Sequence, residues 1–443
     1  MKLKHKNKII VAGMLGNLIE AFDMSTCGLL SVFFAKYLTV DTHDSLLIIL
    51  ATFFLGFLAR PIGALILGLY SDLYGRKRTL AVSILVMGVS TSMIGLIPSF
   101  DVIGIWAVVC LLSLRIIQSF ACGAEFLNSS SFLIESTESG YKGFSGSWAS
   151  FGSMGGVLFA SILLFFIIKT VDGNNTLEPI IWRIPFIFAF LGSLIGLYVR
   201  LYIPESKEYI LQYTPYEKPN FIKLLKESSR YMKSYKTKTA CVFFLGSLGV
   251  ATTFLVYICP SMQVHIYNRF TIIQMLTSNI VSLVVMLFVF PIMGKLSDQL
   301  NRTRLIGCSA VAIVIGLYPF FSVLGSGTYQ ELLIIQSIIA IPAATYYATV
   351  PVFLTELFPI RLRCTALSII YSIAASISGG LIPLTSVYLI RYTQMTTSPI
   401  LIMVCITSIT LVLLSFLKKH SNLHDEKYTN QQGHQQRNLL IPE

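Results

Sequence analysis

FLARPIGALILGLYSDLYGRKRTL, residues 57–80, is the stretch that decides the fold. It begins as an apolar segment, passes through a short turn with Asp72, Gly75 and Arg76, and enters a second apolar segment at once. Apolar segments of about 20 residues are long enough to cross the hydrocarbon core of a bilayer as helices. Charges gathered in the turn between two such segments predict a hairpin in a protein that crosses the membrane several times.

The same pattern occurs again in GKLSDQLNRTRL, residues 294–305. Three of its charged residues lie 226 positions after charged counterparts in the first pattern, and they are Asp298, Arg302 and Arg304. A duplicated half of six helices explains this repeat, and many secondary transporters are built from such repeats. We expect an N-terminal half over 1–203, a cytoplasmic connection over 204–237, a C-terminal half over 238–420 and a disordered tail over 421–443.

The whole chain has the composition of a membrane protein. Of its 443 residues, 54% are hydrophobic and 12% are charged, about half the charged fraction of an ordinary soluble domain. A backbone inside the bilayer must satisfy its own hydrogen bonds, so long apolar segments predict helices. We therefore predict an all-α membrane protein with twelve transmembrane helices. They lie near residues 9–37, 46–70, 79–98, 103–130, 143–168, 181–203, 239–260, 272–293, 305–325, 331–353, 364–390 and 399–417.

The net charge of +12 indicates orientation in the membrane rather than a nucleic-acid partner. Most of the 33 Lys and Arg residues fall at the N-terminus, in the two charged turns, in the central connection and in the tail. Segments with an excess of Lys and Arg stay in the cytoplasm. We expect both termini and the central connection to be cytoplasmic, with their basic residues in contact with anionic membrane lipid.

Patterns typical of catalysis and of metal binding are missing from the sequence. The eight cysteines have no spacing that resembles a metal site or a disulfide framework, and no histidine lies at the centre of an apolar segment. The sequence also has no nucleophile–base set and no phosphate-binding loop. We expect no enzyme activity, no metal and no cofactor, and we expect a monomer.

Four ionisable residues interrupt the apolar segments. Glu20 and Asp23 lie about 18 and about 22 Å from the inner end of the first segment, and Arg60 lies at a similar depth in the second. Arg115 lies about 17 Å from the outer end of the fourth. A charge at mid-bilayer costs about 2.5–3.5 kcal/mol, so these residues need a structural or functional reason. They form either a static ion-pair network or a site where carboxylates exchange protons while arginines hold an anionic substrate.

Helical spacing adds two residues to this set. Gln118 and Glu125 lie on the same face of the fourth segment as Arg115. Glu125 is closer to the cytoplasmic end, which favours a gating or ion-pair role over substrate contact. Because no histidine is central, Glu20 and Asp23 are the candidates for carrying a proton, and their oxygens would also suit sodium.

These segments resemble the major facilitator superfamily. More narrowly, the chain is similar to the metabolite–proton symporter branch, which includes bacterial importers of proline/betaine, ketoglutarate, citrate and shikimate. Beside the two charged turns, the matching stretches are GNLIEAFD (16–23), LRIIQSFACGAEF (114–126), WRIPFIFAFLGSLIGLYVRLYIPES (182–206) and TELFPIRLRCTALSIIYSIAASISGGLIPL (355–384). The resemblance implies two pseudo-symmetric six-helix halves, alternating access and a place in the bacterial inner membrane.

The resemblance also implies roles for individual residues. The charged turns resemble a cytoplasmic lock between transport states, which involves Asp72, Gly75, Arg76, Asp298, Arg302 and Arg304. Arg115 resembles a buried arginine tied to proton coupling. The fifth segment has the glycines Gly152, Gly155 and Gly156 but lacks the Gly-Pro pair of drug–proton antiporters, and this favours import.

Two departures from the family pattern bear on the substrate and on the lock. Ala21 and Phe22 stand where many relatives have tryptophan and a second aromatic residue, which weakens an aromatic cage for betaine. Asn301 stands in the second turn where the first has Gly75, so the second gate should be less exacting. We expect a proton-coupled importer of a small organic anion or zwitterion. The alternatives are a proton-coupled exporter and a non-transporting nutrient sensor of the same fold.

Overall fold

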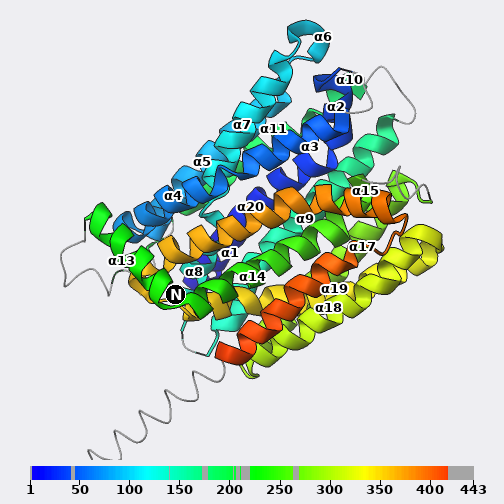
Figure 1. Ribbon diagram of the computed structural model, residues 1–443. Coiled ribbons are helices and arrows are strands. Elements are labelled where there is room, and N and C mark those ends of the chain that lie inside the picture. The colour runs from blue at the N-terminus through cyan, green and yellow to red at the C-terminus, as the bar shows by residue number, and fades with distance from the viewer. Residues whose placement is uncertain are drawn as a thin grey trace, which may run out of the picture.

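The computed structural model describes residues 2–40, 45–138, 140–171, 178–202, 204–205, 210, 220–262 and 269–417. Within these ranges every regular element is a helix, and twelve helices are long and apolar enough to span a membrane (Figure 1). The prediction of an all-α protein with twelve membrane helices is therefore confirmed. The spans are Ile9–Leu29, Ile48–Tyr74, Arg76–Gly95, Trp106–Glu135, Lys142–Thr170, Pro179–Leu201, Lys236–Ser261, Ile272–Ser297, Arg302–Ser326, Tyr329–Glu356, Leu362–Thr393 and Ile400–Leu417.

The first six spans contain more helices than spans, because three of them are interrupted. They are α1 (Lys2–Leu29), α3 (Ser45–Phe57) with α4 (Arg60–Tyr74), α5 (Arg76–Gly95), α7 (Trp106–Cys122) with α8 (Glu125–Glu135), α9 (Lys142–Val171), and α10 (Glu178–Ile181) with α11 (Ile184–Leu201). Shorter helices between the spans are α2 (Ser31–Leu38) and α6 (Phe100–Ile103).

The last six spans follow a short surface helix, α13 (Phe221–Ser234). They are α14 (Lys236–Thr253) continued by a π-helical turn η1 (Phe254–Ile258) and α15 (Cys259–Met262), α17 (Ile272–Ser297), α18 (Arg302–Ser326), α19 (Tyr329–Glu356), α20 (Ile360–Thr393) and the final span Ile400–Leu417. The predicted tail, 421–443, lies outside the described residues.

The interruptions of the second and fourth spans lie side by side. The chain breaks between Phe57 and Arg60, where Pro61 follows the new start, and again after Cys122. A proline in the first turn of a helix is tolerated because its missing N–H has no partner there. At Gly63 a Cβ atom would lie 1.9 Å from the backbone oxygen of Phe120, so only glycine permits this approach. The close packing holds α4 against α7, and it fixes the positions of the buried arginines on both.

Two large apolar clusters form the core. One draws mainly on residues from 241 to 414, and the other mainly on residues from 22 to 189. Each also includes a few side chains from the other part of the chain, such as Met154 in the first cluster and Leu276 in the second. The division into halves over 1–203 and 238–420 remains a prediction, and the clusters are compatible with it.

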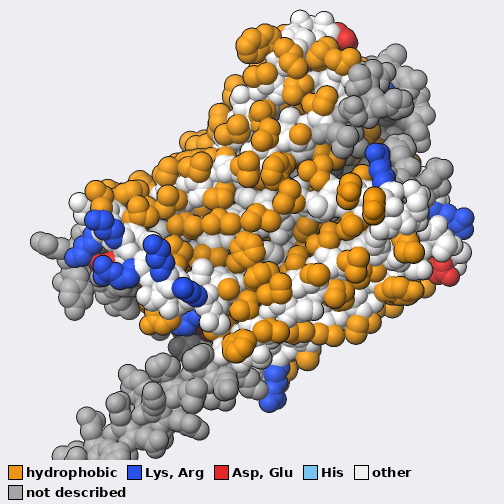
Figure 2. All heavy atoms as spheres, viewed as in Figure 1, with side chains coloured by type: hydrophobic (Ala, Val, Ile, Leu, Met, Phe, Trp, Pro, Cys, Tyr) orange, Lys and Arg blue, Asp and Glu red, His pale blue; other side chains and the backbone are white. Residues whose placement is uncertain are grey.

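The outer surface has apolar sides and one end that carries basic residues. Exposed apolar side chains cover the sides of the bundle (Figure 2), as expected for helices that face hydrocarbon. The start of α1 and the helix α13 lie at one end, while α6 and α10 lie at the other (Figure 1). We call the first of these the basic end, defined by α13 and by the two charged turns at Tyr74–Arg76 and Ser297–Arg302.

Candidate functional site

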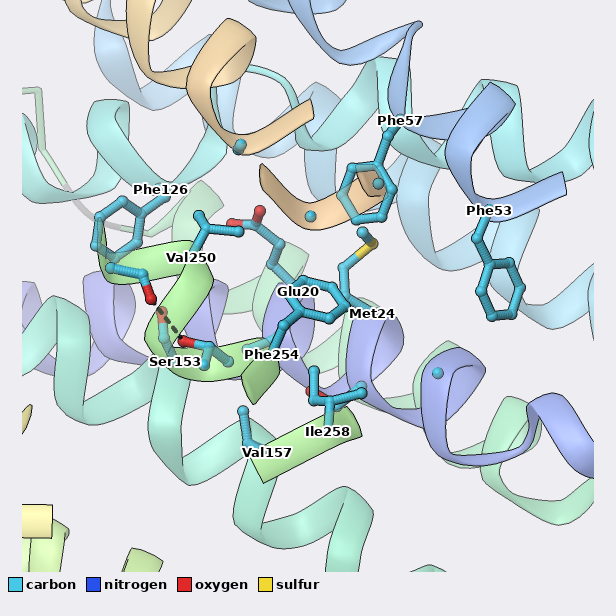
Figure 3. Close-up of a pocket in the computed structure, with 18 of the residues that line it drawn as sticks. Glu20, Met24, Phe53, Phe57, Phe126, Ser153, Val157, Val250, Phe254 and Ile258 are labelled. Carbon is cyan, nitrogen blue, oxygen red and sulfur yellow. Dashed lines mark hydrogen bonds between the residues drawn. The ribbon is translucent and has the colours of Figure 1, made fainter. Parts of the chain in front are cut away.

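A cavity of about 150 Å³ lies inside the bundle, lined by residues from both parts of the chain. Figure 3 shows Glu20 and Met24 of α1, Phe57 of α3 and Phe254 of η1 among the residues that line it. An apolar cavity of about this volume in another protein holds benzene, which gives the scale of a fitting solute. The aromatic side chains in the lining are Phe53, Phe57, Phe126, Phe254, Tyr347 and Tyr371. The polar side chains that line it include Glu20, Arg60, Arg115, Ser153 and Thr253.

Glu20 and Arg60 form a buried ion pair at the wall of this cavity. Arg60 donates from Nη2 to the Glu20 carboxylate, and its guanidinium also lies 5.8 Å from the centre of the Phe57 ring. The Nε–H of Arg60 has no hydrogen-bond partner among the described residues. The structure thus brings together one carboxylate and one arginine that the sequence placed at similar depth.

Asp23 and Arg115 are joined indirectly, through two uncharged side chains. Thr91 donates to Asp23 at 2.8 Å, Gln118 donates to Thr91 at 2.6 Å, and Arg115 donates from Nη1 to Gln118 at 2.6 Å. Sequence reasoning missed Thr91, whose only signal is the polar run Ser90–Ser92 in an apolar segment. The result is a buried chain of hydrogen bonds that links the carboxylate to the guanidinium.

Arg115 retains unused donors beside the cavity. Its guanidinium lies 4.3 Å from the centre of the Phe53 ring, and its Nε–H has no partner among the described residues. Within the described chain, no carboxylate lies within 4.0 Å of it, whereas Arg60 has Glu20. A buried charge is costly unless an opposite charge lies near it, and the carboxylate linked to Arg115 is Asp23, reached through Gln118 and Thr91.

Glu125 lies apart from the cavity in an ion pair of its own. Arg200, at the end of α11, donates to its carboxylate and to the backbone oxygen of Leu80, and Ser83 also donates to Glu125. Arg200 and Glu125 are both fully buried. This contact is an ion pair and not a cavity contact, and sequence reasoning did not identify Arg200 as the partner.

The first charged turn is part of a buried network at the basic end. Asp72 accepts from Arg76 at 2.6 Å, and its other oxygen accepts from the backbone N–H and the hydroxyl of Thr365 at 2.8 and 2.6 Å. Glu135 accepts from Arg76 at 3.4 Å and from Arg363 at 3.0 Å. Because Thr365 and Arg363 belong to α20, these bonds join the first six spans to the last six. Sequence reasoning missed Glu135 and Arg363, although Arg363 lies in one of the matching stretches.

The second charged turn belongs to the last six spans, and it contacts the first six. Asp298 accepts from the backbone N–H groups of Gly143 and Phe144 at 2.6 and 3.0 Å, in the first turn of α9. Carboxylates are favoured at a helix N-terminus because the unpaired N–H groups carry partial positive charge. Arg302 donates to Asp298 at 3.1 Å and also contacts Glu356. This network is more open to solvent than the first, since the Glu356 side chain is 43% exposed.

In the described structure, the side chain of Arg304 makes no contact with the second network. Its backbone N–H donates to the Asn301 side chain at 3.1 Å, and the side chain itself is exposed. The sequence grouped Arg304 with the gate residues because of its spacing. Arg304 lies in the first turn of α18, where Asn301 caps the helix.

Comparison with known families gives matches along nearly the whole chain. Residues 8–239 match the family model described as Sugar (and other) transporter, and residues 240–439 match the one described as Major Facilitator Superfamily. The chain is 30% identical over 430 residues to the Proline/betaine transporter of Escherichia coli (strain K12), with 94% of this chain and 84% of that protein covered. It is 31% identical over 434 residues to the Glycine betaine/proline/ectoine/pipecolic acid transporter OusA of Dickeya dadantii, with the same coverage.

Solved structures with the same fold are more distant in sequence. The proton:xylose symporter XylE bound to 6-bromo-6-deoxy-D-glucose matches with a TM-score of 0.75 at 17% identity, covering 94% of this chain and 96% of that one. The inward open conformation of XylE from E. coli matches with a TM-score of 0.63. At this identity the likeness concerns the fold alone.

Proposed function

This chain belongs to the major facilitator superfamily of membrane transporters, and from that membership we propose that it imports a small zwitterionic or anionic metabolite together with protons. As a member of a transporter family it is not an enzyme. We propose that the basic end faces the cytoplasm of a bacterial cell, with both termini on that side of the inner membrane. Transport would follow from alternating access of the central cavity to the two sides.

The observation that carries the substrate class is Arg115 at the cavity wall. Its guanidinium has free donors and no carboxylate partner in the described chain, so the carboxylate of a solute would complete its surroundings. The Phe53 ring supports one face of the guanidinium and limits its freedom to turn away. We propose that Arg115 receives the carboxylate of the transported solute.

The size and lining of the cavity favour a compact zwitterion over a sugar or a tricarboxylate. A volume of about 150 Å³ suits a solute close to benzene in size, which is the scale of proline or glycine betaine. Aromatic faces such as Phe57, Phe254 and Tyr371 attract a solute cation, and Glu20 lines the same cavity. The missing tryptophan beside Glu20 argued against a betaine cage, and these rings from other helices offer an alternative one. The names of the relatives point to the same class of solute.

Proton coupling would arise from the two carboxylates of α1. Protonation of Glu20 removes the charge that holds Arg60, and protonation of Asp23 changes the hydrogen-bond chain that reaches Arg115 through Thr91 and Gln118. Each event alters the charge around the cavity, so solute binding and proton binding are linked. We propose Asp23 as the carboxylate linked to substrate and Glu20 as the carboxylate that releases Arg60.

Uptake in cells tests this function directly. Cells that express the protein would receive labelled proline, glycine betaine, a dicarboxylate, citrate and shikimate, with and without a protonophore. We expect accumulation of proline or betaine that the protonophore abolishes, and no accumulation with Arg115→Gln. Accumulation that requires sodium and survives the protonophore would make sodium, and not the proton, the coupling ion. No accumulation of any compound would favour the exporter or the sensor instead.

A further inference from the structure

The helix α13 is fixed at the basic end by contacts with both groups of spans. Leu224 is fully buried among Leu69 and Leu73 of α4 and Leu362 of α20. The hydroxyl of Tyr231 donates to the backbone oxygen of Leu357 at 3.3 Å. The helix therefore has a defined orientation, with one apolar face packed on the transporter.

The opposite side of α13 carries a stripe of exposed basic residues. They are Lys223, Lys226, Arg230 and Lys233, and we call them the basic face. Their spacing of three, four and three residues puts them on one side of the helix, away from Leu224. Ile222, at the margin of the basic face, is 59% exposed. Figure 2 shows Lys and Arg side chains gathered at this end, directly beside the apolar flank of the bundle.

Exposed tyrosines indicate the depth of α13 relative to the membrane. Tyr70 and Tyr74 are exposed at the end of α4, with ring centres 4.8 Å apart. Tyrosine is enriched at the boundary between hydrocarbon and headgroups. Because α13 packs on Leu69 and Leu73, in the same part of α4, it lies at the level of this boundary.

We propose that the basic face of α13 binds the phosphate headgroups of anionic phospholipids in the leaflet at the basic end. The apolar flank beside it places the helix next to lipid, and long Lys and Arg side chains reach headgroups while their stems remain against apolar surface. Clusters of basic residues next to a membrane span bind anionic lipid through such contacts. Because α13 packs on both α4 and α20, a bound lipid would stabilise the contacts that α13 makes with the two groups of spans in this conformation.

Photo-crosslinking of the full-length protein in nanodiscs tests this surface. The discs would contain phosphatidylcholine with a small fraction of phosphatidylglycerol that carries a photoreactive group in its headgroup. Mass spectrometry would then map the crosslinks on the chain. We expect crosslinks within 221–238 that fall by about 25-fold in Lys226→Gln/Arg230→Gln, since each basic residue near an anionic surface contributes about fivefold to binding. They should also fall at high salt.

Two controls separate charge from structure. Lys226→Arg keeps the charge and should retain the crosslinks, while Lys169→Gln/Arg391→Gln removes two exposed basic residues far from α13 and should leave them unchanged. A photoreactive phosphatidylcholine should not label the segment. Equal labelling of the wild type and Lys226→Gln/Arg230→Gln would overturn the proposal. Absence of labelling in the wild type would also overturn it, and would leave the basic face for an acidic protein partner.

Discussion

Gly75 and Asn301 occupy matching positions in the two charged turns, yet they solve different local problems. Gly75 has a φ of 108°, which residues other than glycine rarely adopt. A Cβ there would lie 2.1 Å from the Glu205 carboxylate. Asn301 has a φ of −67° and caps α18 by accepting from the backbone N–H of Arg304. The first turn therefore requires glycine, while the second gains a helix cap from asparagine.

Adjacent glycines in α9 provide a test of close packing at the residue scale. A Cβ at Gly156 would lie 2.2 Å from the backbone oxygen of Leu18, whereas one at Gly155 would be 3.8 Å from the nearest atom. We expect Gly156→Ala to destabilise the protein by about 1–3 kcal/mol through overpacking of α9 against α1. Gly155→Ala should be neutral or slightly stabilising, because alanine favours helix. Thermal unfolding in detergent compares the two, and equal midpoints would contradict the described packing.

Arg115→Lys tests whether the guanidinium itself holds the solute. Lysine keeps the charge but lacks the planar fork that binds a carboxylate through two hydrogen bonds. We expect affinity for the transported zwitterion to fall tenfold or more, corresponding to about 1.5–3 kcal/mol for a hydrogen bond to a charged group. Calorimetric titration of the purified protein measures this change. The same affinity in wild type and variant would remove Arg115 from the binding site.

At the scale of elements, the ion pairs of the two charged turns differ in burial. Arg76 is fully buried and bonds to Asp72, Glu135 and the backbone of Ile360. Arg302 is 20% exposed, and its partner Glu356 is 43% exposed. Removing one partner of a buried ion pair costs about 3–5 kcal/mol, while an exposed pair contributes about 0–1 kcal/mol. The first turn should therefore carry most of the stability of the closed state.

Cys364 provides a probe of this difference, because it is fully buried between the two groups of spans beside Thr365. We expect Arg76→Gln to increase the rate at which N-ethylmaleimide modifies Cys364 by tenfold or more, because the basic end opens more often. Arg302→Gln should change the rate much less. Peptide mapping by mass spectrometry follows this one cysteine in the presence of the others. A larger effect from Arg302→Gln would contradict the assignment.

The sequence alone predicted these elements well and their partners less well. Hydrophobic length predicted twelve helices, since a span must be long and apolar wherever it lies. The breaks near Arg60 and Gly123 were not predicted, because they depend on the approach of α4 to α7. Spacing linked Asp72 to Arg76 within one turn, but Thr365, Glu135 and Arg363 come from distant segments that only tertiary packing brings together.

At the scale of the whole molecule, the hydrogen-bond networks at the basic end join the two groups of spans. Bonds from Asp72 to α20 and from Asp298 to α9 both cross between these groups. Opening the basic end requires these bonds to break, while the contacts within each group can persist. This arrangement supports the proposed alternating access of the central cavity, in which Glu20 and Asp23 would link transport to proton movement.

Transport by the purified full-length protein in liposomes tests that proposal most directly. The liposomes would receive an imposed inward proton gradient and the labelled solute identified by cellular uptake. We predict accumulation above equilibrium in the wild type, and its loss when the gradient is collapsed. Glu20→Gln and Asp23→Asn should lose accumulation too, and any variant that still exchanges internal for external solute would show that binding survives. Accumulation that persists without the proton gradient, or that is unchanged in both variants, would contradict proton coupling through these carboxylates.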